Sequence, residues 1–543
     1  MGLFPLQGRA LTVAITMTCG FSFMLFGWDQ GVFGGILNDP TFAKQFKNPN
    51  ATIQGQIVST YDIGCIIGAI ISIYFGDKLG RRKSIAMSCA FVIVGGLLQA
   101  SSFSLAHMIV GRVIAGLGIG QSTAVVPMWQ AETSKAEHRG KLVALQMVMV
   151  IFGIDLTSWI NLGMTYVYSN EVSWRFPIAM QCFWAFVTLG MLACTVESPR
   201  WLCYKERHAE AQVVLARLAA KDREDPSVKI ELKIISDAIA AERAGGAVGW
   251  REVFSGGEQQ NFRRIVLGAG TSVFQQMGGI NVVSIRDTQL IPSPVFVPDV
   301  CRFLGRNTDS NPAKNGQVVY YFPVILTKSF GFSNRLALIL SAIDFISLCV
   351  WGSVIMLLID RFGRVPLMLF GSIGCGTCFT LTTIGLGIGT KASYAMAVSF
   401  MFGYHLFYGL SYLAIPFLYP SEINSSRMRS IGNSAAMVTN WVFVYVVVIM
   451  TPSAISNISW RFYIIFAVLN FAWFPIVWLF YVETKGLSLE EVDRMFKTKY
   501  HAGKSMSYKE AARLAKEETE ELKKQEVEGA DKAVVAEVEI EEK

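Results

Sequence analysis

Charged residues are scarce in this chain. Asp, Glu, Lys and Arg make up 16% of its 543 residues, whereas 52% are hydrophobic and the mean hydropathy is +0.41. Ordinary soluble domains carry about 25% charged residues, and disordered segments combine high charge with few apolar residues. The shortage of charge therefore excludes a string of soluble domains, a disordered chain and a collagen-like fibre, and it predicts a membrane protein.

Residue patterns typical of catalysis or metal binding are also lacking. Most of the ten cysteines lie inside apolar runs, and Cys375-x-x-Cys378 has no second pair or histidine nearby, so we expect packing thiols. The five histidines form no H-E-x-x-H motif, and no nucleophile with a neighbouring base stands out. We therefore predict no disulfide framework, no enzyme, no cofactor and no metal site.

Apolar runs of membrane-spanning length are frequent. A bilayer core needs about 20 apolar residues per helix. Twelve such runs are centred near residues 22, 65, 92, 117, 152, 184, 275, 346, 376, 406, 440 and 470. Lys and Arg cluster in alternate loops, at 78–83, 135–141, 200–263, 361–364 and 427–429. The positive-inside rule places these loops and both termini in the cytoplasm, and it accounts for the basic clusters without a nucleic-acid partner.

Four local patterns of the first half return in the second half, at offsets of 283 to 290 residues. Asp77-x-x-Gly-Arg81 returns as Asp360-x-x-Gly-Arg364. The other repeated pairs are Glu132 with Arg139 and Glu422 with Arg429, Ser173-Trp-Arg-Phe176 and Ser459-Trp-Arg-Phe462, and Val196-Glu197 and Val482-Glu483. The chain is therefore a duplicated six-span unit.

The duplication predicts an all-α membrane protein of twelve transmembrane helices in two pseudo-symmetric six-helix bundles. The expected parts are a cytoplasmic N-terminus at 1–9, an N-terminal bundle at 10–199, a cytoplasmic helical linker at 200–263, a C-terminal bundle at 264–484 and a charged cytoplasmic tail at 485–543. Two halves related by a parallel repeat around one central site are typical of an alternating-access carrier.

Several motifs resemble a known family. Gly76-Asp-Lys-Leu-Gly-Arg-Arg-Lys83 resembles the signature loop of the major facilitator superfamily. Five further motifs, within residues 10–495, resemble its sugar porter family: Pro127-Met-Trp-Gln-Ala-Glu132 with Arg139, Glu197-Ser-Pro-Arg200, Gln275-Gln-x-x-Gly-x-Asn281, Asp360-Arg-x-Gly-Arg364 and Glu483-Thr-Lys-Gly486. The resemblance implies the major facilitator fold and a sugar or polyol carrier of the plasma membrane.

Charged residues at the cytoplasmic span ends form a candidate gate. They are Asp77, Arg81, Glu132, Arg139, Glu197, Asp360, Arg364, Glu422, Arg429 and Glu483. As solvated loop charges, such pairs would be worth only about 0–1 kcal/mol each. The resemblance implies instead that they lock the outward-open state and part when the carrier opens inward.

Asp29 lies inside the first span. A carboxylate at that depth must face a cavity, pair with a cation or bind a proton, and Arg112 near the start of the fourth span is the expected partner. The resemblance implies that Asp29 accepts the coupled proton; a static polar pair is the alternative. Asp62, Asp155 and Asp344 also lie in apolar runs, but the sequence gives them no role.

Five amides and one aromatic residue form the candidate substrate site. They are Gln181, assigned to the fifth span, Gln275, Gln276 and Asn281 in the seventh, Asn440 in the eleventh, and Phe417. Amides both donate and accept hydrogen bonds, so they suit neutral hydroxyl-bearing ligands; hydrogen bonding between helices is the alternative. The resemblance places Phe417 where many hexose carriers have a tryptophan and Val444 where the family has a second asparagine. Hexoses, pentoses and linear polyols such as glycerol therefore all remain candidate substrates.

Residues 283–317 interrupt the seventh span with charges and prolines. Such a segment cannot lie in hydrocarbon with its backbone unsatisfied, and removing it restores the family's spacing before Tyr320-Tyr321. We hypothesise a translated retained intron, because Val283-Ser284 can be encoded by a donor-like GTAAGT and Gln317 by an acceptor-like CAG. The alternative is an extruded loop, in which case we expect Asn281 to be displaced.

The sequence as a whole predicts a secondary active transporter of a neutral monosaccharide or polyol, coupled to protons and embedded in the lipid bilayer. Two alternatives stay open: a transport-like sensor that binds sugar and signals through its tail, and a carrier of a carboxylic or aromatic acid such as quinate. The acid carrier would need a cation among the cavity residues, and Arg112 is the only candidate.

Overall fold

The computed structural model describes residues 6–37, 39–49, 51–135, 138–167, 170–243, 253–254, 257–283, 334–425, 428–503 and 506–521. Every regular element in those ranges is a helix. The inserted segment, apart from Val283, and the span residues that follow it lie outside the described ranges. The structure therefore does not test the intron hypothesis.

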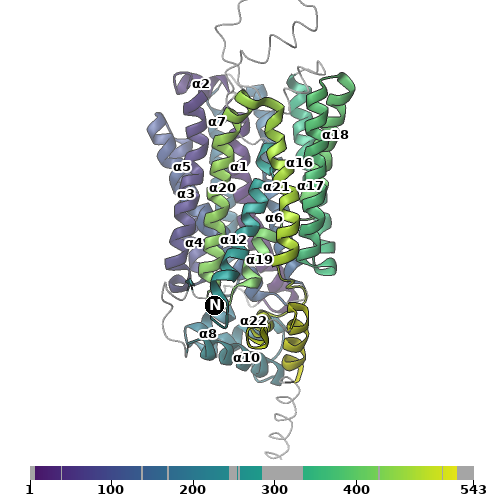
Figure 1. Cartoon of the computed structure of the whole chain (residues 1–543). Coiled ribbons are helices and arrows are strands. Elements are labelled where there is room, and N and C mark those ends of the chain that lie inside the picture. Colours follow the sequence, from purple (N-terminus) through teal and green to yellow (C-terminus); the bar gives the residue numbers. More distant parts are fainter. Residues whose placement is uncertain are drawn as a thin grey trace, which may run out of the picture.

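Six long helices form the N-terminal half. They are α1 (Gly8–Ile36), α3 (Ala51–Leu79), α4 (Arg81–Ala100), α5 (Leu105–Thr133), α6 (Arg139–Met164) and α7 (Val172–Ala193), with the short elements α2 (Pro40–Gln45) and η1 (Thr165–Val167) between them. All six are long and apolar enough to cross a membrane. They stand side by side in one bundle (Figure 1).

The C-terminal half repeats this arrangement. Its elements are α12 (Asn261–Met277), α13 (Ile280–Val283), α16 (Asn334–Phe362), α17 (Arg364–Ile388), α18 (Lys391–Gly409), α19 (Ile415–Ile423), α20 (Arg429–Ile458), η3 (Ser459–Arg461) and α21 (Phe462–Phe480). Helices α16, α17, α20 and α21 complete a set of ten candidate spans in the described part of the chain. The other two expected spans correspond to α12 with α13 and to α18 with α19, and the arrangement is that of the twelve-helix major facilitator fold.

The expected span near residue 406 is broken into α18 and α19. Gly409 ends α18, and Pro416 occupies the first turn of α19. Proline has no backbone N–H and disfavours helical geometry in the residue before it. The break therefore leaves backbone carbonyls between the two helices without helical partners.

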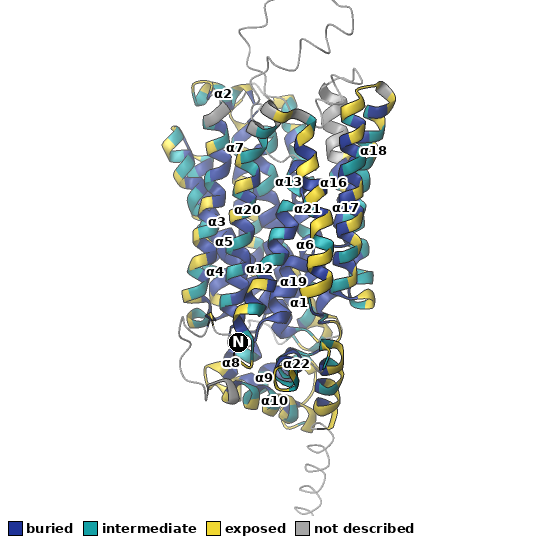
Figure 2. Cartoon of the chain, viewed as in Figure 1, coloured by how far each residue is buried: buried dark blue, intermediate teal, exposed yellow. Residues whose placement is uncertain are grey.

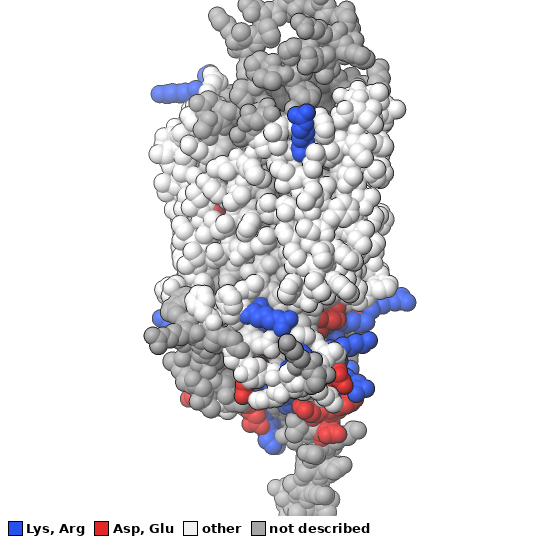
Figure 3. Space-filling model, in the orientation of Figure 1, with Lys and Arg blue, Asp and Glu red and all other residues white. Residues whose placement is uncertain are grey.

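One end of the bundle is covered by four short helices, α8 (Pro199–Tyr204), α9 (His208–Ala219), α10 (Pro226–Arg243) and α22 (Leu489–Ala502). We call this the capped end; it is the lower end in Figure 1. Charged side chains gather there, whereas the middle of the visible surface is almost free of them (Figure 3). An uncharged band flanked by a charged end matches a bilayer core flanked by water.

The two halves meet mainly along two helix pairs, α3 with α20 and α6 with α16, and α5 also contacts α20 and α19. Buried residues lie between the helices, and exposed positions face outward (Figure 2). Many of these outward positions are large and apolar, for example Leu97, Phe186, Leu357, Val468 and Trp478. Such apolar faces are unfavourable in water but suit contact with lipid.

Candidate functional site

Amides of the C-terminal half, all buried except the half-buried Asn281, form a continuous hydrogen-bonded chain. Gln276 Nε2 donates to Asn440 Oδ1 at 2.7 Å and lies 3.4 Å from Gln275 Oε1. Asn281 Nδ2 donates to Gln276 Oε1 at 2.7 Å. The chain thus joins α12, α13 and α20. The displacement of Asn281 expected for a chain that retains the insertion is therefore not seen.

The chain is anchored at the broken helix. Gln275 Nε2 donates to Tyr412 O at 3.0 Å and to Leu413 O at 3.2 Å, both between α18 and α19. These are the carbonyls that the break leaves without helical partners. The amide chain and the helix break therefore stabilise each other.

Aromatic side chains pack where the halves face each other. The Phe417 ring of α19 meets the Phe23 ring of α1 edge to face, with centroids 5.7 Å apart. Phe26 packs against Trp441 in the same way at 5.4 Å, and Trp441 Nε1 donates to Thr123 Oγ1 of α5 at 3.2 Å. Phe417 and Asn440 thus lie on helices that contribute to the centre of the molecule.

The structure corrects the placement of Gln181. This residue lies on α7, the sixth membrane helix, and not on the fifth as expected from the sequence. It is fully buried against α4, where a Cβ added to Gly96 would come within 2.9 Å of it. Gln181 therefore packs inside the N-terminal half, on helices other than those that carry the amide chain, and both of its side-chain polar atoms lack a hydrogen-bond partner in the described part of the chain.

Four buried amides escaped the sequence analysis. Both side-chain polar atoms of each lack a hydrogen-bond partner in the described part of the chain, and the four are Gln121 and Gln130 of α5, Gln146 of α6 and Asn433 of α20. Buried amides normally find partners. Their position inside apolar runs of the sequence could have identified them as candidates. These four side chains offer further hydrogen-bond donors and acceptors to water or to a ligand.

Asp29 and Arg112 form a buried ion pair, with Arg112 Nη1 3.1 Å from Asp29 Oδ2 and side-chain exposures of 3% and 0% for Arg112 and Asp29. The guanidinium has other anchors as well. It donates to Ile57 O and Val58 O of α3, each at 3.2 Å, and it lies over the ring of Phe33 at 4.4 Å. Arg112 therefore stays hydrogen-bonded whether or not Asp29 carries a charge.

Two equivalent charge clusters, which we call braces, stand at the capped end. In the first, Arg81 Nε and Nη2 donate to the two oxygens of Glu132 at 3.0 and 2.9 Å, and Nη1 donates to Asp77 at 3.0 Å. Glu197 accepts the backbone N–H of Arg81 at 3.0 Å and that of Arg82 at 3.2 Å. The first brace thus ties α3, α4 and α5 to the segment after α7.

The second brace repeats the first atom for atom. Arg364 Nε and Nη2 donate to Glu422 at 3.0 and 2.7 Å, and Nη1 donates to Asp360 at 3.2 Å. Glu483 accepts the backbone N–H groups of Arg364 and Val365, each at 3.0 Å. Arg139 and Arg429 also match, because each donates through Nε to a backbone carbonyl at 3.1 Å.

A glycine permits each brace to close. Gly80 and Gly363 have φ of +84° and +98°, which side-chain-bearing residues rarely adopt. A Cβ added at these positions would lie 2.8 Å from Glu197 Oε2 and 2.5 Å from Glu483 Oε2. The repeated Asp-x-x-Gly-Arg pattern thus encodes both the turn and the room for the glutamate.

The strongest charge pairs of the braces lie within one half, so they need not part when the halves move. Other interactions cross between the halves: Lys141 N donates to Asp360 Oδ2 at 2.9 Å. The charge of Glu422 acts on Arg139, and that of Arg429 acts on Glu132. Arg200 of α8 also forms an ion pair with Glu490 of α22, which joins the linker to the tail. That these charge pairs part when the carrier opens inward stays a prediction.

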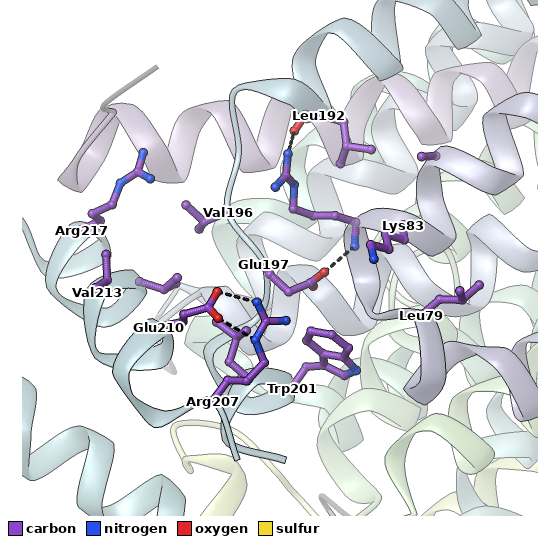
Figure 4. Close-up of a pocket in the computed structure, with 14 residues that line it drawn as sticks. Leu79, Lys83, Leu192, Val196, Glu197, Trp201, Arg207, Glu210, Val213 and Arg217 are labelled. Carbon is purple, nitrogen blue, oxygen red and sulfur yellow. Dashed lines mark hydrogen bonds and ion pairs between the residues drawn. The ribbon is translucent and has the colours of Figure 1, made fainter. Parts of the chain in front are cut away.

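Glu197 also borders a cavity of about 390 Å³ on the flank of the capped end (Figure 4). Burial raises the pKa of the Glu197 carboxyl, while the backbone N–H of Ser198 and the charge of Arg81 oppose that rise. Charged side chains, among them Lys83, Arg207 and Glu210, line this cavity. The charged lining of this cavity contrasts with the uncharged amide chain, and a neutral substrate does not need such charges. We therefore do not assign the cavity to a neutral substrate.

The fold and these clusters match known transporters. The family model described as "Sugar (and other) transporter" matches residues 13–301 and 315–496, and its interruption falls inside the proposed insertion. The MFS-type transporter oryC of Aspergillus oryzae is 37% identical over 91% of this chain and 87% of its own length. The sugar transporter STL1 of Saccharomyces cerevisiae is 32% identical over 92% of this chain and 83% of its own length.

Solved structures show the same fold. The proton:xylose symporter XylE, bound to 6-bromo-6-deoxy-D-glucose, superposes with a TM-score of 0.75 at 23% identity and covers 90% of this chain and 100% of its own. The inward-open form of XylE from E. coli superposes less well, with a TM-score of 0.62 at 22% identity over 89% of this chain and 99% of its own. With the family model and two curated relatives in agreement, this chain belongs to the sugar transporter family of the major facilitator superfamily, and it is a membrane transporter, not an enzyme.

Proposed function

We propose that this protein carries a neutral sugar or polyol together with a proton across the plasma membrane by alternating access. The chain of buried, uncharged amides at the centre carries the proposal, because amides match the alternating donors and acceptors of hydroxyl groups. Family membership and the names of the relatives, which include sugar transporters and a proton:xylose symporter, support it.

The anchors of Arg112 support the proton-coupling step. A protonated Asp29 would release the guanidinium, which keeps two carbonyls of α3 and an aromatic face. Neither state of the pair then leaves a buried charge without partners. Asp29 can therefore exchange its ion pair for a proton at modest cost, which is what coupling requires.

The same anchors weigh against an acid carrier. A substrate carboxylate would need a cation, and Arg112 is engaged by Asp29 and by α3. The proposed binding set is Gln275, Gln276, Asn281, Phe417 and Asn440, without Gln181. Phe417 and Val444 are both buried. Compared with the family pattern, Phe417 lacks the indole N–H donor of a tryptophan, and Val444 lacks the amide of an asparagine. The proposed substrates therefore include pentoses and linear polyols as well as hexoses.

We propose that the capped end and both termini face the cytoplasm. The hydrogen bond from Lys141 N to Asp360, which crosses between the halves at that end, supports a state that is closed toward the cytoplasm.

Uptake measurements test the proposed function. Cells lacking their own sugar carriers would express the chain and receive radiolabelled hexoses, pentoses, glycerol and quinate, with and without an uncoupler. We expect accumulation of at least one sugar or polyol that the uncoupler collapses. Binding without flux would instead indicate a sensor, and uptake of quinate alone would indicate an acid carrier.

Asp360→Asn should weaken closure of the capped end, because the charge that accepts the Lys141 N–H is lost. The expected cost is about 1 kcal/mol, or about a fivefold shift in population toward the inward-open state. Distances between spin labels at the exposed residues Lys83 and Arg361 would report it. Asp77→Asn is the matched control, because Asp77 pairs with Arg81 inside its own half; equal shifts in both variants would contradict the cross-half role.

Sequencing of mature transcripts tests the intron hypothesis. We expect most mature transcripts to lack the codons for 283–317, and a chain without this segment to transport at least as well as the full chain. Mature messages that mostly keep the segment would end the hypothesis. Because Asn281 holds its place beside Gln276 in the full chain, transport by the full chain would remain compatible with the proposed site.

A further inference from the structure

His405 and Asp344 lie within ion-pair distance of each other inside the C-terminal half, and they form an ion pair when the imidazole is protonated. His405 Nδ1 of α18 lies 3.0 Å from Asp344 Oδ1 of α16, with side-chain exposures of 0% and 7%. Both residues lie in helices of the membrane-spanning bundle, and neither belongs to the amide chain or to a brace. The sequence left Asp344 without a role and did not single out His405.

An acid at this depth is costly unless it has a cation or a proton. Among the described residues, His405 is the only basic side chain within ion-pair distance of Asp344. Imidazole is also the side chain whose charge ordinarily changes between about pH 5 and 8. A proton on the imidazole pairs the two groups, whereas its loss leaves the carboxylate buried beside a neutral ring.

The surroundings offer no competing basic group among the described contacts. On α18 the rings of Tyr404 and His405 lie 6.0 Å apart, and Tyr408 stacks on Tyr404. On the neighbouring helices, Cys375 and Cys378 of α17 face Tyr404, and Asp155 of α6 faces Cys349 of α16. Thiols and phenols are neutral near pH 7, so Asp155 is the one further acid among these groups.

The internal repeat relates the pair of His405 and Asp344 to the pair of Arg112 and Asp29. Helix α5, which carries Arg112 and Glu132, corresponds to the broken helix α18 with α19, which carries His405 and Glu422. Each half therefore holds one buried acid–base pair. The bases lie on equivalent helices, whereas Asp29 of α1 and Asp344 of α16 do not. The pair in the N-terminal half uses arginine, which keeps its charge, and the pair in the C-terminal half uses histidine, which can lose it.

The pair also occupies a position that can affect movement. His405 lies four residues before the end of α18, where the span breaks, and α16 packs against α6 at the interface of the halves. A charged pair between α16 and α18 ties the outer part of the broken span to an interface helix.

We propose that Asp344 and His405 form a second proton-binding site, which holds the C-terminal helices α16 and α18 together when occupied. The proton resides on the imidazole, with the Asp344 carboxylate as its counter-ion. This proposal rests on the fold and on the ion pair, and it does not depend on which substrate is carried.

Nitrogen NMR of the full-length protein, labelled with ¹⁵N-histidine and reconstituted in lipid nanodiscs, tests the site directly. We expect one imidazole signal that changes charge within about pH 5 to 9 and is missing in His405→Gln. In Asp344→Asn its midpoint should move by at least about 1 pH unit, because the counter-charge at 3.0 Å is gone. A His405 ring that stays neutral throughout, or a midpoint unchanged in Asp344→Asn, would overturn the proposal.

The chain provides a matched control. His501 lies 3.5 Å from Glu258, but these side chains are 64% and 55% exposed. Glu258→Gln should therefore move the His501 midpoint by less than about 0.5 pH unit. If His405→Gln fails to fold, the double variant Asp344→Asn with His405→Gln supplies the same spectral assignment, because an uncharged amide pair can replace the ion pair. Since this readout involves no transport, failure here and failure of the uptake assays are distinguishable.

Discussion

Replacing Asp29 with asparagine should abolish uphill accumulation while substrate exchange across the membrane continues. Asparagine cannot take up a proton, but it leaves Arg112 bound to Ile57 O and Val58 O. One proton contributes about 2.3 kcal/mol per 100 mV and about 1.4 kcal/mol per pH unit. A potential of 100 mV and a gradient of one pH unit together supply roughly 3.7 kcal/mol per proton. Without this driving force, the ratio of internal to external substrate should fall from about 500 to about one.

Two measurements on the same variant separate coupling from binding. Steady-state accumulation in energised cells reports coupling, and counterflow in proteoliposomes without a proton gradient reports exchange. Asp155→Asn is the matched control, because it removes another acid from the membrane-spanning part, one that is only half-buried and belongs to neither buried acid–base pair. Full accumulation by Asp29→Asn, with an unchanged response to the uncoupler, would refute the role of Asp29.

Gln276→Leu should lower the affinity for substrate by about 10- to 100-fold. Gln276 is the junction of the amide chain, since it contacts Gln275, Asn440 and Asn281. Leucine has a similar size but removes one hydrogen-bond partner from each of these three amides, and each unpaired buried polar group costs about 1–3 kcal/mol. The concentration dependence of uptake, with the amount of protein at the surface measured in parallel, would show the loss.

Gln181→Leu gives the matching comparison. If Gln181 bound substrate, as the sequence predicted, its loss would lower affinity to a similar extent. Its position on α7 against Gly96 predicts a changed amount of folded protein but an unchanged half-saturating concentration. Equal losses of affinity in the two variants would contradict the proposed composition of the site.

The repeat made the braces predictable from the sequence. Asp77, Arg81 and Glu132 return as Asp360, Arg364 and Glu422 with similar spacing, and equal residues in equal helices must form equal contacts. The ion pair of Asp29 with Arg112 could also be anticipated, because a carboxylate at that depth needs a cation and few were available. What the pattern could not show is that each brace closes within one half, since spacing along the chain does not say which helices become neighbours.

Other features lay beyond the sequence for physical reasons. Gly409 and Pro416 accompany the break between α18 and α19, but the group that satisfies the Tyr412 carbonyl there is Gln275, which lies 137 residues away in the chain. The pairing of His405 with Asp344 joins two helices that are not adjacent in sequence. Gln181 was assigned to the fifth span although the sixth apolar run is centred near residue 184, and only packing against α4 shows which face of α7 it occupies.

The braces also bear on how the protein is made. Every residue of the first brace, from Asp77 to Glu197, precedes the linker, so the N-terminal half possesses its complete set of contacts before the second half leaves the ribosome. Domains commonly fold in order of synthesis. The first six helices should therefore reach a native, protease-resistant arrangement in the membrane as a nascent chain, and errors of biogenesis should concentrate in the half that is translated last.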